Sequence, residues 1–480
     1  APDPSERGTR TRNRLLAVVL LGAATAIVVG TQSVGAGRPQ RAEIDFRAPT
    51  RTHLDHTPFF NAPFSSPDAV TTACLECHPE AATEVMGTSH WQWLGEEVRI
   101  PGHPEPQRIG KKNLLNNFCI SITGNFASCT KCHVGYGWQD DRFDFTDETK
   151  VDCLVCHDHS GTYLKGSAGM PAPEVDLLAA AQSVGVPQRE NCTVCHAYGG
   201  GGQAVKHGDL DSSLENPSAH DDLHMGRDGF LCIDCHRTEH HEIRGRAFSV
   251  SVENANGIHC TDCHRQPPHA DPRLNAHLSA VACEACHIPT FSRKLPSKSY
   301  WDWSKAGDPT RPEDPHEYLK IKGEFVYEHD VVPEYRWFNE TMDRYLLGDT
   351  IDPDGITPIN RPLGDIHDPT AKITPFKVHR ARQPYDTQLL TLLPPLTAGE
   401  GGFWHDFDWD QALRRGAEAS AVSYSGQYGW AVTEMFWPIS HMVTPKEDAL
   451  DCTGCHGAEG RLDWTALGYP GDPIRVGGRR

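Results

Sequence analysis

Eight short stretches of the chain share the pattern Cys-x-x-Cys-His, which accounts for all but one of the 17 cysteines. Two thiols at this spacing can add to the two vinyl groups of a haem as thioethers, and the histidine that follows can bind the iron. Zinc sites also pair Cys-x-x-Cys units, but they do not need that histidine. The pattern therefore predicts eight covalently bound haem c groups, attached at Cys74/Cys77/His78, Cys129/Cys132/His133, Cys153/Cys156/His157, Cys192/Cys195/His196, Cys232/Cys235/His236, Cys260/Cys263/His264, Cys283/Cys286/His287 and Cys452/Cys455/His456.

The ligand on the second face of each iron decides what a haem can do. An iron with protein ligands on both faces carries electrons, whereas an iron with an open or weakly held face can do chemistry. The chain has 27 histidines, enough to supply a second ligand to every iron. The candidates with the most suitable settings are His90, His207, His224, His241, His269, His277 and His441, with His220, His240 and His259 as substitutes.

Lys206 is a candidate of a different kind, because it follows four consecutive glycines, 199–202. A lysine must lose its proton to bind iron, which costs about 4.6 kcal/mol at pH 7, while a histidine loses almost nothing. Such a ligand is given up more readily, which suits an iron that must accept a substrate. Glycine backbone can also approach a porphyrin closely. The alternative is that Lys206 is a solvated loop lysine.

Cys119 is the cysteine left over from the eight motifs, and it lies ten residues before Cys129. An unpaired cysteine in a secreted protein has two interpretations. It is either a buried core thiol or a thiol at a substrate pocket, where it could exchange with a sulfur–sulfur bond.

The N-terminal segment has the pattern of a secretory signal. Arg10, Arg12 and Arg14 precede an apolar run over 15–30, and small residues follow at 34–37. The run is shorter than a membrane span of about 20 residues, but the uncharged stretch continues to 37, so an uncleaved anchor is the alternative. We predict that residues 1–36 are a signal peptide or membrane anchor and that the protein is periplasmic, where haem c is attached.

Composition agrees with a chain that wraps haems. Hydrophobic residues make up only 38% of 480, and porphyrins would supply the missing apolar surface. The net charge of -19 argues against nucleic acid as a partner. The predicted fold is mainly α with extensive irregular loops and few short strands, organised around stacked haems.

The motifs divide the chain unevenly, because seven lie between 74 and 287 and the eighth begins at 452. We predict a haem body over 37–287, a haem-free covering segment rich in proline and aromatics over 288–400, and a helical C-terminal part over 401–480 with haem 8. Local patterns predict helices over 79–86, 174–183 and 408–422, strands over 324–327 and 335–338, and a helix start at 444–447.

Seven stretches extend beyond the haem motifs themselves: MGTSHWQW, KKNLLNNFCIS, CHVGYGW, VDCLVCHD with SGTY, GGGGQAVKHGDLD, VACEACHIP and PISHMVTPKEDALDC. In these the chain resembles the octahaem tetrathionate reductase family of periplasmic c-type cytochromes, from about residue 70 to 460. The resemblance implies seven haems with two histidine ligands and one catalytic haem, on Cys129, Cys132 and His133. It also implies Lys206 as the second ligand of that iron and His207 as a ligand of a neighbouring iron.

The same resemblance implies the reaction and its partners. Members of that family reduce tetrathionate, nitrite and hydroxylamine, with electrons that arrive from a quinol-linked or cytochrome donor. The family places an acidic residue three before its lysine, whereas this chain has Gln203, so a proton-donor role there is not carried over. Lys165 and Lys150 are the alternative lysine ligands. The rival functions are a non-catalytic electron conduit and an oxidase of the hydroxylamine type.

Overall fold

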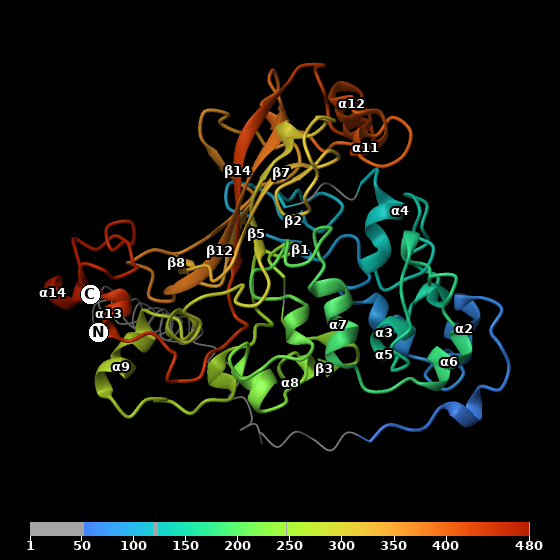
Figure 1. Cartoon of the computed structure of the whole chain (residues 1–480), viewed down its shortest axis with the longest axis horizontal. Coiled ribbons are helices and arrows are strands. Elements are labelled where there is room, and N and C mark those ends of the chain that lie inside the picture. Colours follow the sequence, from blue (N-terminus) through green and yellow to red (C-terminus); the bar gives the residue numbers. More distant parts are fainter. Residues whose placement is uncertain (1–51, 119–122, 246, 480) are drawn as a thin grey trace, which may run out of the picture. The chain divides into compact units, whose positions relative to one another are not determined.

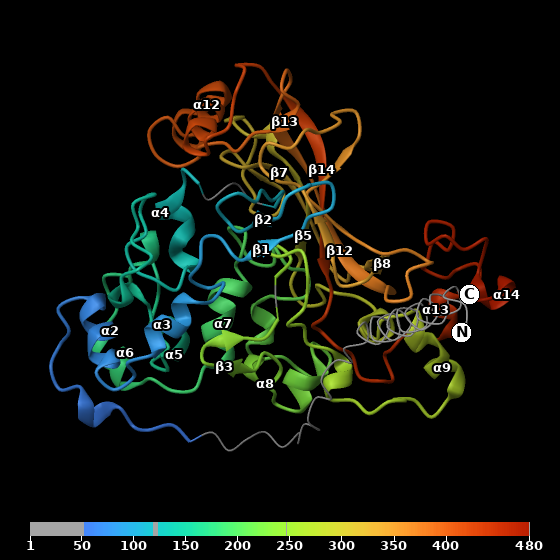
Figure 2. The same ribbon diagram turned by 180° about the vertical axis from the view of Figure 1, so that it is seen from behind.

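The computed structural model describes residues 52–118, 123–245 and 247–479 of the chain (Figures 1 and 2). The predicted signal segment and Cys119 therefore lie outside the described residues. His259–Gln266 groups apart from the larger unit, and it forms one helical turn, Cys260–Asp262. In the described part of the chain, no helix has the length and apolar character needed to cross a membrane.

Short helical turns carry the haem motifs. The backbone N–H of His157 donates to the carbonyl of Cys153 (3.2 Å). In the first motif, the backbone N–H of His78 likewise donates to the carbonyl of Cys74 (3.0 Å). Residues three and four apart on a helix share one face, so such a turn puts both thiols and the imidazole on the same side. The helices up to residue 287 are α2 (Pro67–Leu75), α3 (Ala81–Met86), α4 (Phe126–Cys129), α5 (Leu154–His157), α6 (Leu177–Gln182), α7 (Arg189–His196), α8 (Cys232–Cys235), α9 (Pro272–Ala276) and α10 (Glu284–His287).

An eight-stranded sheet follows these helices, in the order β10-β14-β12-β5-β7-β6, with β8 and β13 also paired to β12. Its centre is the antiparallel pair of β12 and β14, in register from Phe376 opposite Pro438 to Asp386 opposite Tyr428. The two long strands cross the middle of Figure 1. The strands are β5 (Ser297–Asp302), β6 (Tyr318–Leu319), β7 (Gly323–Glu328), β8 (Glu334–Phe338), β10 (Ile356–Pro358), β12 (Lys372–Asp386), β13 (Thr391–Leu392) and β14 (Tyr428–Pro438).

Three two-stranded ribbons and four further helices complete the described residues. The ribbons pair β1 with β2, β3 with β4, and β9 with β11. Their bounds are β1 (Glu97–Val98), β2 (Gln107–Arg108), β3 (Thr238–Glu239), β4 (Glu242–Ile243), β9 (Met342–Arg344) and β11 (Asn360–Pro362), and the helices are α11 (Phe403–Asp406), α12 (Trp409–Ala419), α13 (Cys452–Cys455) and α14 (Pro473–Val476).

The predicted multihaem fold has less helix than expected, because helices hold 24% and strands 18% of the residues that the structure describes. The haem-free stretch is a sheet rather than irregular covering, and β14 joins that sheet from the C-terminal part, which is therefore not simply helical. The predicted helices over 79–86, 174–183 and 408–422 are confirmed by α3, α6 and α12, and the predicted strands by β7 and β8. The helix start at 444–447 is wrong: the Thr444 hydroxyl donates to the His287 carbonyl (3.1 Å), and α13 begins after Asp451, which caps it.

The sheet supports the segment that contains Lys206. Phe118 and Val205 pack in one core cluster with Trp437 of β14. From β12, the Lys377 amine donates to the carbonyl of Val205 (2.9 Å) and to the hydroxyl of Ser297 (2.5 Å). The sheet thereby holds the backbone directly before Lys206 in one position.

Candidate metal centres

Cysteines from different motifs lie side by side in the larger unit. The side chain of Cys74 contacts that of Cys153, Cys132 contacts Cys195, and Cys192 contacts Cys232. Each cysteine of a motif is a point of attachment for a haem edge. The contacts therefore place motifs 1 and 3, motifs 2 and 4, and motifs 4 and 5 at adjoining haem edges.

Most cysteines and histidines of the haem motifs are partly buried, but some have exposed side chains. Seven have exposed side chains: Cys77, His78, His196, Cys235, Cys263, His264 and Cys452. The motif turn still forms around them, since the backbone N–H of Cys77 donates to the Cys74 carbonyl (3.2 Å) and that of His264 to the Cys260 carbonyl (2.8 Å). A short motif holds no information about burial, so the sequence could not distinguish these positions. The roles of Cys77 at haem 1 and of Cys263 and His264 at haem 6 gain no support from burial and stay predictions.

Five motif histidines face a second histidine at nearly the same separation. A metal–nitrogen bond of roughly 2 Å on each side, with the ring centre about 1 Å behind the nitrogen, puts two axial imidazole centres roughly 6 Å apart. Five pairs within the described residues have separations between 6.1 and 6.4 Å: His56–His78, His90–His196, His236–His441, His269–His287 and His277–His456. The residues present thus fit a haem iron between the members of each pair.

Burial keeps several of these histidines in the form that binds metal. It lowers the pKa of His90 to about 4 and that of His133 to about 3. An imidazole must be neutral to bind a metal ion. These side chains are therefore ready ligands at neutral pH.

His133, the histidine of motif 2, has different neighbours from the paired histidines. Its ring contacts Trp91, Trp138, Phe143 and Phe145, with centroids 4.7 to 6.0 Å apart, and none of these rings binds iron. Its Nε2 bonds the Trp91 carbonyl (2.8 Å), while its Nδ1 is buried without a partner. A backbone carbonyl on one ring nitrogen is the usual way of orienting a metal-binding imidazole.

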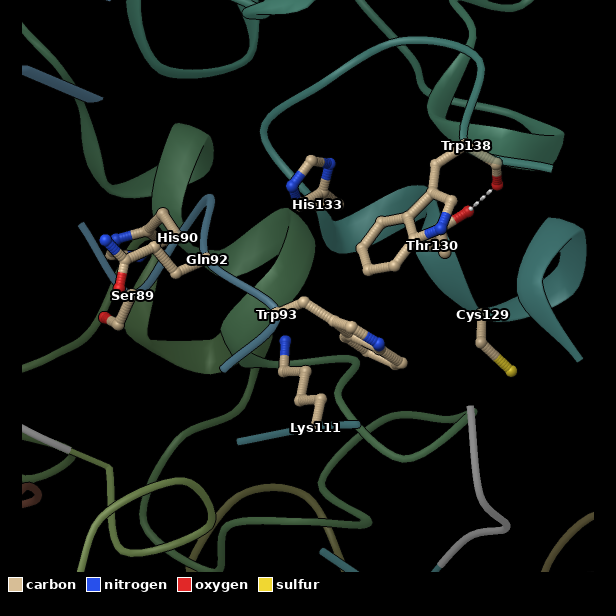
Figure 3. Close-up of a pocket in the computed structure, with 9 residues that line it drawn as sticks. All are labelled: Ser89, His90, Gln92, Trp93, Lys111, Cys129, Thr130, His133 and Trp138. Carbon is tan, nitrogen blue, oxygen red and sulfur yellow. Dashed lines mark hydrogen bonds between the residues drawn. The ribbon is translucent and has the colours of Figure 1, made fainter. Parts of the chain in front are cut away.

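A small pocket opens beside motif 2 (Figure 3). Cys129, Thr130 and His133 line it from the motif, and Lys111 brings a cationic amine to it. The Thr130 hydroxyl donates to the Trp138 carbonyl (2.8 Å), which fixes one wall. Because His90 also lines the pocket, the space of motif 2 borders on the His90–His196 pair.

Lys206 lies where motifs 2 and 4 meet. The surrounding protein lowers its pKa from 10.5 to about 7, chiefly by desolvation and then through Lys111, while Cys132 acts in the opposite direction. Its amine lies over the Trp437 ring (5.3 Å), and no carboxylate pairs with it among the described residues. Since a pKa near 7 removes most of the deprotonation cost expected for an ordinary lysine, Lys206 can present a neutral amine.

The two alternative lysines are already engaged. Lys165 forms a buried ion pair with Asp152 (2.8 Å) and donates to the His133 carbonyl (2.6 Å). Lys150 pairs with Asp68 (2.6 Å). Of the three lysines, Lys206 is the one whose amine is available to a metal.

The other candidates from the sequence have varied settings. His207 packs on Trp437 (5.0 Å), and His224 lies near Phe230 (5.9 Å). His241 shares the carboxylate of Glu84 with His240, at 2.7 and 2.8 Å. His220 is exposed beside Asp448, and His259 belongs to the small unit, so the two remain untested substitutes. The amide of Gln203 bonds the Ser212 hydroxyl.

Sequence reasoning missed His56 and Lys111. His56 lies three residues after His53 and upstream of the first motif, and this spacing of two histidines could have singled it out. Lys111 gave no such indication, because a lysine pair next to a glycine has the pattern of an ordinary surface loop. Only the folded chain brings Lys111 to the pocket.

The count of haems can be checked directly. We expect the mature full-length protein to carry eight covalent haems, because all eight motifs keep both cysteines and the histidine. Intact-protein mass spectrometry should exceed the polypeptide mass by eight haem masses. A deficit of one haem in fully matured protein would contradict the count.

Comparisons with known proteins agree with this geometry. A family model described as bacterial cytochrome c matches residues 298–459. An uncharacterized protein of Archaeoglobus fulgidus is 23% identical over 286 residues, which are 48% of this chain and 92% of that protein. The crystal structure of an octahaem cytochrome c from Shewanella oneidensis has a TM-score of 0.83 and 47% identity, and the match covers 88% of this chain and 98% of that chain. The chain therefore belongs to the family of octahaem c-type cytochromes.

Proposed function

We propose that this cytochrome is a periplasmic reductase of small inorganic substrates, tetrathionate together with nitrite and hydroxylamine, with its catalytic centre at motif 2. The observation that carries the proposal is the contrast between motif histidines. Five face a second histidine about 6 Å away, whereas His133 is surrounded by aromatic rings and Lys206 offers a neutral amine nearby. The bound haems supply electron transfer and, where a ligand is weakly held, a coordination position for the substrate.

Protein groups around motif 2 suit an anionic substrate. Tetrathionate and nitrite carry negative charge, and Lys111 places a positive charge on the pocket wall. The low-dielectric surroundings of Trp93 and Trp138 strengthen that attraction relative to water. With a haem bound at motif 2, Lys206 would be the residue that holds its second face, and a neutral amine is a ligand that could give way to substrate. The two-electron reduction of tetrathionate breaks its central sulfur–sulfur bond and gives two thiosulfate ions.

The cysteine contacts support a route for the electrons. Cys132 of motif 2 touches Cys195 of motif 4, and Cys192 of motif 4 touches Cys232 of motif 5. Electrons from a quinol-linked or cytochrome donor would reach motif 2 through motif 4. In this role the haem of motif 4, which His90 and His196 would hold, would be the immediate electron donor to the catalytic centre.

Turnover measurements test the proposal. The purified full-length holoprotein, supplied with a reduced viologen, should reduce tetrathionate, nitrite and hydroxylamine, and each should oxidise the viologen faster than a heat-denatured control. No turnover with any of the three, together with eight low-spin irons, would favour the electron conduit. Oxidation of hydroxylamine in the presence of an electron acceptor, without any reductase activity, would favour the oxidase.

A further inference from the structure

The paired histidines differ in what holds their outer ring nitrogen. Backbone carbonyls accept from Nδ1 of His56, His236 and His277, at 2.8, 2.9 and 2.8 Å. Carboxylates take this place at two positions: Asp209 lies 3.1 Å from Nδ1 of His441, and Asp472 lies 2.6 Å from Nδ1 of His456. The two carboxylates belong to different pairs, those of motifs 5 and 8.

Asp209 is built into the interior as an anion. Its side chain is 2% exposed, and besides His441 it accepts the backbone N–H groups of Ser440 (2.8 Å) and His441 (2.9 Å). The carboxylate therefore lies directly behind His441, the histidine that faces His236 of motif 5.

Asp472 makes the matching arrangement at motif 8. It accepts the backbone N–H groups of Gly457 (2.7 Å) and Ile474 (3.0 Å), and its side chain is 12% exposed. Asp472 thus both caps the N-terminus of α14 and orients His456.

A carboxylate behind an axial histidine changes the balance between two iron oxidation states. It strengthens the imidazole as an electron donor, and it stabilises the ferric haem, which carries one more positive charge than the ferrous haem. A backbone carbonyl has only a dipole to offer. We propose that Asp209 and Asp472 make the haems of motifs 5 and 8 the lowest in reduction potential among the five paired haems. The proposal rests on haem attachment and on no particular substrate.

The positions of motifs 5 and 8 suggest how a difference in reduction potential would affect electron flow. Helix α13 with motif 8 lies at one end of the larger unit, and α2 and α5 with motifs 1 and 3 lie at the other, in both views (Figures 1 and 2). Motif 5 adjoins motif 4 through Cys232 and Cys192. A low-potential haem at motif 8 accepts only strongly reducing electrons, and one at motif 5 passes them on readily to motif 4.

Glu84 is a third carboxylate that contacts a candidate axial histidine, His241, but it does not extend the proposal. One carboxylate oxygen of Glu84 contacts His240 and the other contacts His241, and the Glu84 side chain is 26% exposed. Among the described residues, His241 also has no motif histidine at the separation of the five pairs. The proposal is therefore confined to Asp209 and Asp472.

The test is a potentiometric titration of full-length holoprotein, followed by absorbance and by the low-spin EPR signals. Asp209→Asn and Asp472→Asn keep a side chain of the same size but remove the charge. Each should raise the midpoint potential of one haem component out of eight, with the larger shift for the more buried Asp209, and should alter one low-spin EPR signal. Asp386→Asn is the matched control, because Asp386 is buried and holds backbone N–H groups of Gln388 and Leu389 but touches no motif histidine among the described residues.

Unchanged titrations in both variants, with eight haems retained, would overturn the proposal. If Asp209→Asn loses haem because two backbone bonds weaken, Asp472→Asn decides the matter alone, since its site lies near the surface. A shift of equal size in Asp386→Asn would also overturn it, because the effect would then be general rather than directed through an axial histidine. None of these outcomes depends on turnover, so the potentiometric titration still tests this proposal if the reductase proposal fails.

Discussion

Replacing Lys206 with alanine should convert one haem of eight from low-spin to high-spin at neutral pH, and leave the other seven low-spin. Lys206 lies between motifs 2 and 4, and its amine, unlike those of Lys165 and Lys150, is not held in an ion pair among the described residues. The pKa of Lys206 is lowered to about 7. Without that amine the iron of motif 2 has no protein ligand on its second face. EPR and absorption spectra of the variant beside the wild type would measure the change, and cyanide or nitrite should bind it more readily.

The same competition predicts an acid transition in the wild type. The lysine binds iron in its neutral form, so protons compete for the same lone pair. A depressed pKa keeps the neutral form present down to about pH 7, and iron binding extends it further into acid. As pH falls below 7, one haem should become high-spin before the others, because a paired histidine such as His90, with a pKa of about 4, stays neutral to lower pH than the lysine.

Two variants control the result. Lys206→His should keep the iron low-spin and suppress turnover, since a histidine is released less easily. Lys111→Ala removes the other lysine close to the site without removing the ligand, so its low-spin count should match the wild type. Identical spectra for Lys206→Ala and the wild type would make Lys206 a loop lysine and refute its role.

Replacing Lys165 with methionine should have the opposite signature, a large loss of stability with the spin states unchanged. Lys165 and Asp152 form an ion pair in which their side chains are 5% and 0% exposed. Removing one partner of a buried pair leaves an uncompensated charge and costs about 3–5 kcal/mol. The same Asp152 accepts from the Tyr136 and Tyr163 hydroxyls, so the network around motif 3 loses the cation that Lys165 supplies to it. Denaturation in guanidinium would measure the change in the free energy of unfolding.

A double variant separates charge from packing. Combining Lys165→Met with Asp152→Asn removes both charges, and should recover part of the stability that the single change loses. No recovery would show that packing of the lysine stem, rather than the ion pair, is responsible. A high-spin haem in Lys165→Met with stability retained would instead make Lys165 the iron ligand.

The sequence predicted the local chemistry well, because haem attachment depends on residues only a few positions apart. Helices α3, α6 and α12 were also predictable from their apolar patterns and capping residues. The sheet was not, since its central strand β12 contains Pro375 and Pro384 together with Lys377, Arg380 and Arg382. Such residues argue against a buried strand. In the folded chain the charges find partners, for example Arg380 with Glu334 (2.7 Å).

Pairings across the chain were beyond sequence reasoning for a similar reason. His90 meets His196 and His441 meets His236 only after folding, and local sequence holds no record of such distances. The histidines themselves could be singled out by type and setting. The groups that bind the other ring nitrogen of these histidines, such as Asp209 at His441, could be identified only from the hydrogen bonds of the folded chain.

The cross-motif cysteine contacts bear on how the protein must mature. A chain that folded before haem attachment would bring Cys74 against Cys153, and Cys132 against Cys195, as thiols. In an oxidising compartment neighbouring thiols are readily joined as disulfides, and a disulfide between two motifs would block attachment at both. We therefore expect thioether formation before closure of the fold to give a higher yield of mature protein than attachment to a chain that has already folded.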